Sequence, residues 1–184
     1  MKPIALFGAV ATVALASALC LIAPPPPFLP VLVHRGLHLL GMVLLLGNSI
    51  SGAAWLAQAD ASKSLTQLHF SLKSINRLDV WMTAPAAVLI VVNGAALAVL
   101  HGGVLKPRWL QLGVGLFVGA GLLWGAVLVP MQIGLEKACR QALLHGDSTP
   151  PALLRRRLVR YFVSGGVVGT LLIAALWVMV LKPL

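Results

Sequence analysis

A row of residues that could carry chemistry runs along one stretch of this 184-residue chain, between His34 and Trp55. Its members recur every three or four positions, which is the spacing of one face of a helix. They are His38, Gly41, Leu45, Asn48, Gly52 and Trp55. An imidazole and an amide on an otherwise apolar helix form a candidate site, because both groups can bind a ligand or a neighbouring helix.

Three histidines are candidates for holding a cofactor. His34 and His38 are four positions apart and share a helix face if the helix begins early enough, and His101 follows a later apolar run. Neutral imidazole is a common ligand for haem iron and copper, and Met42, one turn from His38, adds a thioether suited to Cu(I). We therefore predict a haem b or copper site with His38 as the metal ligand and assign no catalytic residue. The alternative is that these are interfacial histidines without a cofactor.

A second polar row begins just before a later apolar run. Its members are Asp79, Thr83, Ala86, Ile90, Asn93 and Leu97. Asn48 and Asn93 need partners in an apolar setting, so they either join helices, including to each other, or line a substrate or proton path. Arg77 and Asp79 are two positions apart and cannot face each other on a helix. We expect Asp79 to be an interfacial anchor, or to pair with Lys73 or a loop arginine.

The composition assigns the chain to the membrane proteins. Apolar residues make up 59% of it and charged residues 10%, whereas soluble domains have about a quarter charged residues. The net charge of +10 comes from short gaps between apolar runs, which is a membrane topology signal and excludes a nucleic-acid footprint. No Ser-His-Asp set, phosphate loop or paired carboxylates support a hydrolase or a nucleotide-driven protein.

The hydropathy pattern predicts an all-α bundle with five membrane-spanning helices. The spans are residues 4–23, 37–59, 80–100, 109–131 and 161–181. We expect two domains: residues 1–36, an N-terminal helix with a proline-rich connector, and residues 37–184, an antiparallel four-helix core. Residues 62–79 are predicted as an interfacial or protruding helix, residues 132–145 as a helix that lies past the membrane edge, and Pro85 as a kink. The first run is longer than a signal-peptide core, which favours a retained helix over a cleaved signal.

Charge between the spans predicts the orientation. With the N-terminus inside, ten of the Lys and Arg residues lie on the inner side and four on the outer side, so we expect a cytoplasmic N-terminus. Arginines before the last span are expected to contact anionic lipid. They are Arg155, Arg156, Arg157 and Arg160.

Glycine pairs four positions apart offer a different function. Gly115 with Gly119, Gly121 with Gly125, and Gly165 with Gly169 let helix backbones approach closely. They suit a non-enzymatic accessory or assembly protein that binds another membrane protein or itself. A small transporter is a third hypothesis, which lacks an ionisable group deep in a predicted span.

Two segments resemble a known family. They are LHLLGMVLLLGNSISGAAW and INRLDVWMTAPAAVLIVVNGAALA, and they resemble the bacterial integral-membrane family named domain of unknown function 2269. The matching positions are Leu37, His38, Gly41, Gly47, Asn48, Arg77, Leu78 and Asp79. The resemblance covers Leu37 to the C-terminus and implies a multi-pass protein of the bacterial inner membrane. The family is distantly similar to copper-resistance D-type and membrane protoporphyrinogen oxidase-type four-helix proteins, in which a histidine matches His38.

Overall fold

The structure is a computed structural model that describes residues 3–182. Over that range the chain forms helices joined by loops, with no strand. The elements are α1 (Pro3–Ile22), α2 (Val31–Ala61), α3 (Leu65–Leu78), η1 (Asp79–Thr83), α4 (Ala84–Val99), α5 (Arg108–Leu123), η2 (Trp124–Leu128), α6 (Val129–Leu144) and α7 (Ala152–Leu181). The all-α prediction is confirmed.

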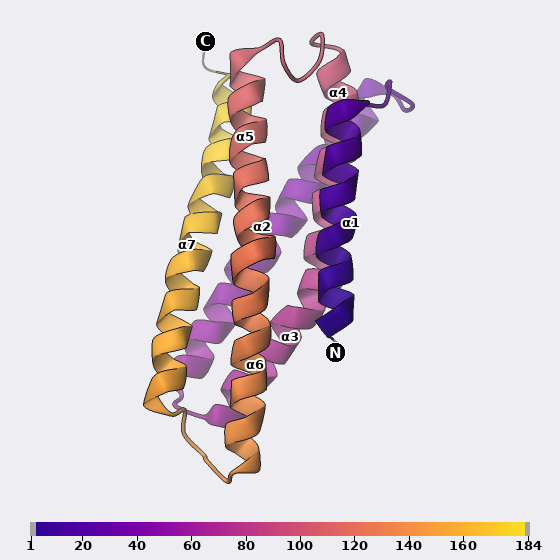
Figure 1. Cartoon of the computed structure of the whole chain (residues 1–184). Helices are drawn as coiled ribbons and strands as arrows, with labels where there is room; N and C mark the ends of the chain where they lie inside the picture. The colour runs from indigo at the N-terminus through magenta and orange to yellow at the C-terminus, as the bar shows by residue number, and fades with distance from the viewer. Residues whose placement is uncertain (1–2, 183–184) are drawn as a thin grey trace.

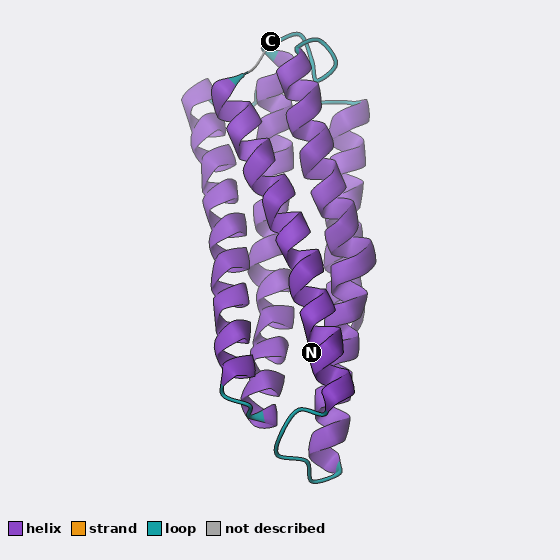
Figure 2. Cartoon of the chain, turned by 90° about the vertical axis from the view of Figure 1, so that its left-hand side faces the viewer, coloured by secondary structure: helices purple, strands orange, loops and turns teal. Residues whose placement is uncertain are grey.

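These elements make five rods that run side by side, with loops at the two ends of the molecule (Figures 1 and 2). The rods contain 20, 31, 35, 37 and 30 residues, and each is long and apolar enough to cross a membrane. A bilayer core requires about 20 residues of helix, so the five-span prediction is confirmed. We call the end of the bundle with the C-terminus in Figure 1 the upper end and the opposite end the lower end.

The third and fourth rods are longer than their predicted spans. Residues 62–79 and 132–145 are not separate helices, because α3 continues through η1 into α4, and α5 continues through η2 into α6. Both segments therefore extend the third and fourth rods. α3 begins at Ser64, whose hydroxyl accepts from the amide of Gln67, and α6 ends before Gly146, whose φ is +87°.

The two π-helical turns, η1 and η2, each end two residues before a proline. The amide of Ala84 donates to the carbonyl of Asp79 before Pro85, and the amide of Val129 donates to the carbonyl of Trp124 before Pro130. Proline removes a helical donor and crowds the preceding turn, so a widened turn accommodates it without breaking the rod. The predicted distortion at Pro85 therefore takes the form of a π turn.

Two apolar clusters hold the rods together. The lower cluster joins α2, α3, α6 and α7 around fully buried leucines, which are Leu56, Leu65, Leu68, Leu72 and Leu158. The upper cluster joins α2 and α4 to α5 and α7 through Met42, Leu45, Ile90, Ala120 and Leu172. The former surface-helix candidates thus extend the bundle, because their apolar faces bury each other.

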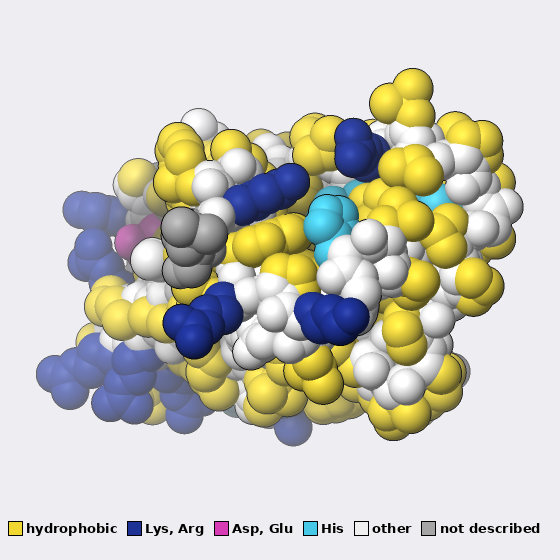
Figure 3. Space-filling view, turned by 90° about the horizontal axis from the view of Figure 1, so that it is seen from above, with side chains coloured by type: hydrophobic (Ala, Val, Ile, Leu, Met, Phe, Trp, Pro, Cys, Tyr) yellow, Lys and Arg dark blue, Asp and Glu magenta, His cyan; other side chains and the backbone are white. Residues whose placement is uncertain are grey.

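Close backbone contact between α2 and α4 depends on Gly41. A Cβ at this position would lie 2.8 Å from the carbonyl oxygen of Ala86 and 2.8 Å from a side-chain carbon of Ile90. α1 packs along α4, with Leu6 buried. The outer surface exposes many large apolar residues, as Figure 3 shows for the upper end, and this is the surface expected to face lipid.

Candidate functional site

His38 has a fixed ring with one free nitrogen lone pair. Its Nδ1 lies 2.8 Å from the carbonyl oxygen of Ile90 on α4. A carbonyl only accepts, so Nδ1 carries the proton and Nε2 is the unprotonated nitrogen. The ring lies against Gly94, where a Cβ would come within 2.9 Å of a ring carbon. The absence of a side chain at Gly94 therefore makes room for the imidazole.

His34 is bonded at both nitrogens and is fully buried. The amide of Leu29 donates to Nε2 at 3.2 Å, so Nδ1 carries the proton and donates to Oδ1 of Asn93 at 2.8 Å. Phe28 covers the ring edge-to-face at 4.6 Å between centroids. α2 begins at Val31, not at 37, which brings His34 into the helix and lets the connector fold over it. In this arrangement His34 has no free lone pair for a metal.

His101 and Met42 lie away from a common point with His38. His101 is exposed at the upper end, with its Nδ1 3.2 Å from the carbonyl of Leu97. Gly94, beside His38, is separated from His101 by seven residues of chain, about 10 Å along a helix. Met42 is buried in the upper apolar cluster. Within residues 3–182, no group of three His, Cys, Asp or Glu side chains gathers as a metal site would require.

The two deep asparagines do not bond each other. Asn93 Nδ2 donates to the carbonyl of Leu89, and its Oδ1 accepts from His34. Asn48 Nδ2 donates instead to Oγ1 of Thr83 at 2.8 Å. Each amide therefore joins α2 to the third rod, but at different levels. The alternative in which they pair with each other is wrong.

Asp79 is buried in the bundle, with 7% of its surface exposed. Its Oδ1 accepts from the hydroxyl of Thr83 at 2.9 Å, and its Oδ2 accepts from Nε2 of Gln132 at 2.9 Å. None of the salt bridges found among residues 3–182 involves this carboxyl group. The expected pairing with Lys73 or a loop arginine is therefore wrong, because neutral donors surround the carboxyl group.

Two chains of donors converge on Asp79. On one side Asn48 donates to Thr83, which donates to Asp79. On the other side the hydroxyl of Tyr161 on α7 donates to Oε1 of Gln132 at 3.3 Å, and Gln132 donates to Asp79. We call these five residues the Asp79 network. It links α2, the third rod, the fourth rod and α7 at the π turn η1, and π turns are frequent at functional sites.

A polar cluster lies one helical turn below this network. Nδ2 of Asn76 donates to Glu136 at 3.3 Å, and Nε2 of His69 lies 3.7 Å from the other carboxylate oxygen of Glu136. Asn76 is three positions before Asp79, and Glu136 is four positions after Gln132, so the cluster and the network share the facing sides of α3 and α6. Oδ1 of Asn76 and Nε2 of His69 are buried atoms without a hydrogen-bond partner among the described residues.

Sequence reasoning missed most of this arrangement. Thr83 appeared in the second polar row, but Gln132 was assigned to a helix beyond the membrane and Tyr161 only marked the start of a span. One feature of the sequence could have indicated the contact. Asp79, Gln132 and Tyr161 each stand at the edge of an apolar run, so they are expected at the same depth in the membrane. Arg77, which the sequence analysis considered together with Asp79, is exposed and is not in the network.

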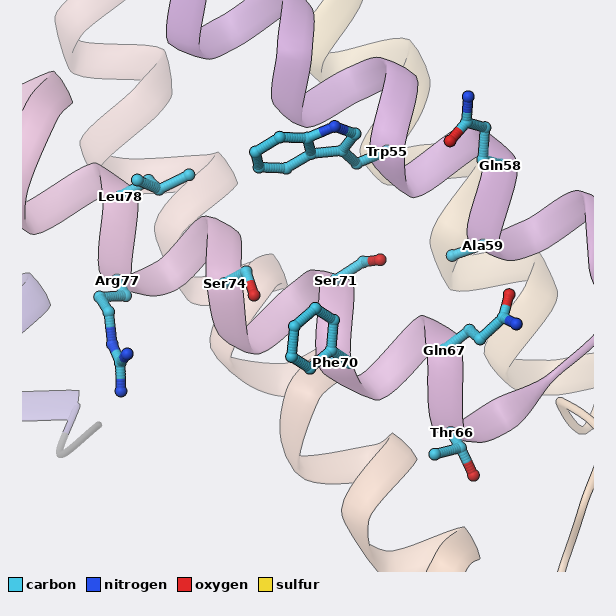
Figure 4. A pocket seen from close by; sticks show the side chains of 10 residues that line it. All are labelled: Trp55, Gln58, Ala59, Thr66, Gln67, Phe70, Ser71, Ser74, Arg77 and Leu78. Carbon is cyan, nitrogen blue, oxygen red and sulfur yellow. The ribbon is translucent and has the colours of Figure 1, made fainter.

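Arg77 lines an open hollow of about 740 Å³ between the lower end of α2 and α3 (Figure 4). Its other lining side chains include Trp55, Gln58, Phe70 and Ser74. These α3 residues lie on the opposite helical face from Asn76 and Asp79. The hollow therefore belongs to the outer surface and is separate from the buried network.

The comparisons with known proteins concern the family alone. A family model described as "Predicted integral membrane protein (DUF2269)" matches residues 32–183. No curated protein and no solved structure matches the chain. The matched region begins at the start of α2 and includes His38 and the whole Asp79 network. This multi-pass membrane protein therefore belongs to the DUF2269 family.

Proposed function

We propose that this chain is a membrane redox protein that binds haem b through His38. The observation that carries the proposal is the state of the His38 ring, which donates from Nδ1 to the Ile90 carbonyl and keeps Nε2 free. A hydrogen bond from the far nitrogen to a carbonyl is the usual way in which a metal-ligating histidine is held and its tautomer fixed. When bound, haem b would supply one-electron transfer.

The donor set favours haem over copper. A haem group would need only one or two ligands from the protein. His38 fits that requirement alone, whereas a copper centre would draw more ligands from the chain. Met42 is the nearest soft candidate along α2, and it is packed in the upper apolar cluster. We therefore propose His38 as the iron ligand and leave His34 and His101 outside the first coordination sphere.

The proposal is tested by haem content per chain after purification from a haem-replete host. We expect His38→Ala to lose the haem, because no other ring nitrogen with the same constraint lies at that level. His145→Ala is the matched control, since His145 is exposed at the lower end of the bundle. Equal haem content in the two variants would rule out His38 as the ligand.

A second candidate function is an accessory protein that binds another membrane protein. It is favoured by glycines whose faces are open: no atom of a neighbouring element lies within 4 Å of a Cβ built at Gly115, Gly119, Gly165 or Gly169. Gly125, by contrast, is covered by Val10. The open positions lie on α5 and α7, where a partner helix could approach closely.

This candidate predicts a complex that depends on those glycines. Wild-type protein extracted in mild detergent should migrate as a dimer or with a second membrane protein, and Gly119→Leu with Gly169→Leu should release it. Gly8→Leu is the control, because Gly8 also faces open space but lies on α1. A wild-type chain that migrates alone would remove this candidate.

We also propose the bacterial inner membrane as the location and anionic lipid as a contact. Arg155, Arg156, Arg157 and Arg160 are exposed at the lower end, which the charge distribution assigns to the cytoplasm. Nε of Arg155 lies 3.9 Å from Oδ1 of Asp60, so this arginine also braces α7 against α2. Each of the others would contribute about 1 kcal/mol to lipid attraction near a negatively charged surface.

A further inference from the structure

We propose that Asp79 is a proton-binding carboxylate in the core of the bundle and that its proton enters from the lower end past His69 and Glu136. The proposal goes beyond the haem site. Its residues lie elsewhere: Thr83 is seven residues before Ile90, about 10 Å along the helix from the His38 contact.

The hydrogen bonds around Asp79 leave its charge to be balanced by a proton. Both carboxylate oxygens accept, one from Thr83 and one from Gln132, which is the pattern that stabilises an ionised carboxylate. Neutral donors do not cancel a buried charge, and buried charges are normally paired. No salt bridge within residues 3–182 supplies a cation to Asp79. A proton on either oxygen would remove the charge without moving a helix.

The groups that face Asp79 from the surrounding elements are mostly neutral. α2 contributes Asn48, the fourth rod contributes Gln132 and, one turn lower, Glu136, and α7 contributes Tyr161. In α1 the one titratable side chain, Cys20, lies at the opposite end of that helix from Leu6. Arg77 is exposed toward the outer hollow. Glu136 and Tyr161 are therefore the titratable side chains beside Asp79.

The network can accept a proton by reversing its hydrogen bonds. With Asp79 ionised, the amide nitrogen of Gln132 donates to it and the amide oxygen accepts from Tyr161. When a proton bonds to Oδ2, the new O–H becomes a donor, and rotation of the Gln132 amide presents its oxygen to Asp79 and its nitrogen to the Tyr161 oxygen. A phenol oxygen can accept as well as donate, so the contacts of Gln132 with Asp79 and with Tyr161 each keep a donor and an acceptor in both states.

Access from the lower end follows the facing sides of α3 and α6. The side chains of His69 and Glu136 are 22% and 20% exposed, so both reach the surface of the bundle in its lower half. Asn76 continues inward from Glu136, with a buried oxygen that has no protein partner among the described residues. Residues four apart on a helix lie about 5–6 Å apart, a separation that one water molecule can bridge between Glu136 and Gln132.

The row of polar side chains that leads from His69 to Asp79 ends at the upper apolar cluster. Above Asn48 and Thr83, α2 and α4 pack through Leu45, Ala86 and Ala87, which carry no proton-transferring group. The next polar contacts on these two helices are those of His38 and His34. Among the described residues, the polar side chains that lead to Asp79 therefore come from the lower end.

Infrared spectroscopy tests the proton site, because the chain contains only four Asp and Glu residues. Spectra of wild-type protein in lipid nanodiscs, cycled between acidic and alkaline buffer, should contain a reversible protonated-carboxyl band from a dry environment. Asp79→Asn, which has nearly the same shape, should lose that band. Asp147→Asn, an exposed loop variant, should keep it. A band that persists in folded Asp79→Asn, or the absence of the band in wild type, would overturn the proposal.

Two further variants keep the test decisive if Asp79→Asn does not fold. Thr83→Val removes one donor to Asp79 and should shift the frequency of the band in otherwise intact protein. Glu136→Leu should slow formation of the band several-fold after a rapid drop in pH, while Asp60→Asn should leave the rate unchanged. An unshifted band in Thr83→Val would contradict the assignment to Asp79, and an unchanged rate in Glu136→Leu would contradict the entrance. Haem content is not measured in either case, so the outcome is independent of the haem proposal.

Discussion

Two histidines four residues apart on α2 have opposite chemical capacities. His34 donates from one nitrogen and accepts at the other, so its ring is part of the packing of the upper end. His38 donates from one nitrogen only, so it keeps a lone pair that can bind a metal. The difference comes from what covers each ring: the connector folds over His34, whereas His38 lies against a glycine.

The Asn48–Thr83 hydrogen bond should be visible as an energetic coupling. In a thermal-stability double-mutant cycle with Asn48→Leu and Thr83→Val, we expect a coupling free energy of about 1 kcal/mol, the size of an interhelical hydrogen bond in a membrane protein. The bond is 2.8 Å long and buried, so Asn48→Leu removes a donor to the Thr83 hydroxyl, and Thr83→Val leaves the amide nitrogen of Asn48 without its acceptor.

The matched control for that cycle is Asn48→Leu with Asn93→Leu. These asparagines bond to different partners at different levels, so their effects should add within experimental error. Additive effects for Asn48 and Thr83, together with coupling between Asn48 and Asn93, would contradict the structure.

At the scale of the elements, the third and fourth rods carry the site because each contains a π turn before a proline. The π turn η1 contributes Asp79 and Thr83, and Gln132 follows η2 by four residues. A regular helix would rotate the residues on one side of each turn relative to the other. The widened turns thus let the same rod present apolar residues to lipid and polar residues to the network.

The close approach of α2 and α4 at Gly41 should be sensitive to one methyl group. Gly41→Ala places a Cβ within 2.8 Å of a backbone oxygen, which cannot move aside as a side chain can. We expect a loss of about 1–3 kcal/mol in the free energy of unfolding, the usual cost of overpacking. The measurement is a thermal or denaturant melt in detergent.

Gly47→Ala is the control for that measurement, because it lies on the same helix and faces open space. It should be neutral or stabilising by up to about 1 kcal/mol, since alanine is the better helix former. Similar losses for Gly41→Ala and Gly47→Ala would show that the contact is not as tight as described.

At the scale of the whole molecule, the Lys and Arg residues are divided unequally between the two ends of the bundle. The lower end holds the arginines of α7, and the upper end holds the loop between α4 and α5. Loops rich in Lys and Arg stay in the cytoplasm, so the polar entrance beside Glu136 is expected to open to the cytoplasm and His38 to lie toward the outer face.

Cysteine labelling in bacterial cells tests this orientation. In a background where Cys20 and Cys139 are replaced by serine, Leu105→Cys should react with an impermeant thiol reagent in cells whose outer membrane has been opened. Asp147→Cys should react only after the inner membrane is permeabilised. Both positions are exposed on loops at opposite ends of the bundle. The reverse pattern would place the arginine cluster and the entrance to Asp79 outside.

The membrane spans could be predicted from the sequence, but the polar contacts between them could not. Hydropathy alone identifies the five rods, because lipid demands long apolar helices. The hydropathy falls at Asp79 and Gln132, so the sequence places the ends of two spans there. The contact between these two residues could not be predicted, because it joins segments more than fifty positions apart in the chain.

The candidate site was predicted in its residue types but not in its connections. His38, Asn48, Asn93 and Asp79 could be selected because polar groups are rare on these helices. Their partners could not: His34 is bonded by the backbone of Leu29 and by Asn93, and neither follows from spacing along α2. Hydrogen bonding between rods depends on their relative height, which no local pattern encodes.

The absorption spectrum of the detergent-purified wild-type protein, oxidised and then reduced with dithionite, tests the central claim most directly. The host must be replete in haem and copper, and metal analysis of the same sample must accompany the spectrum. We predict a Soret band and sharp α and β bands on reduction. A colourless, metal-free protein would contradict a redox function, and copper without those bands would contradict haem as the cofactor of His38.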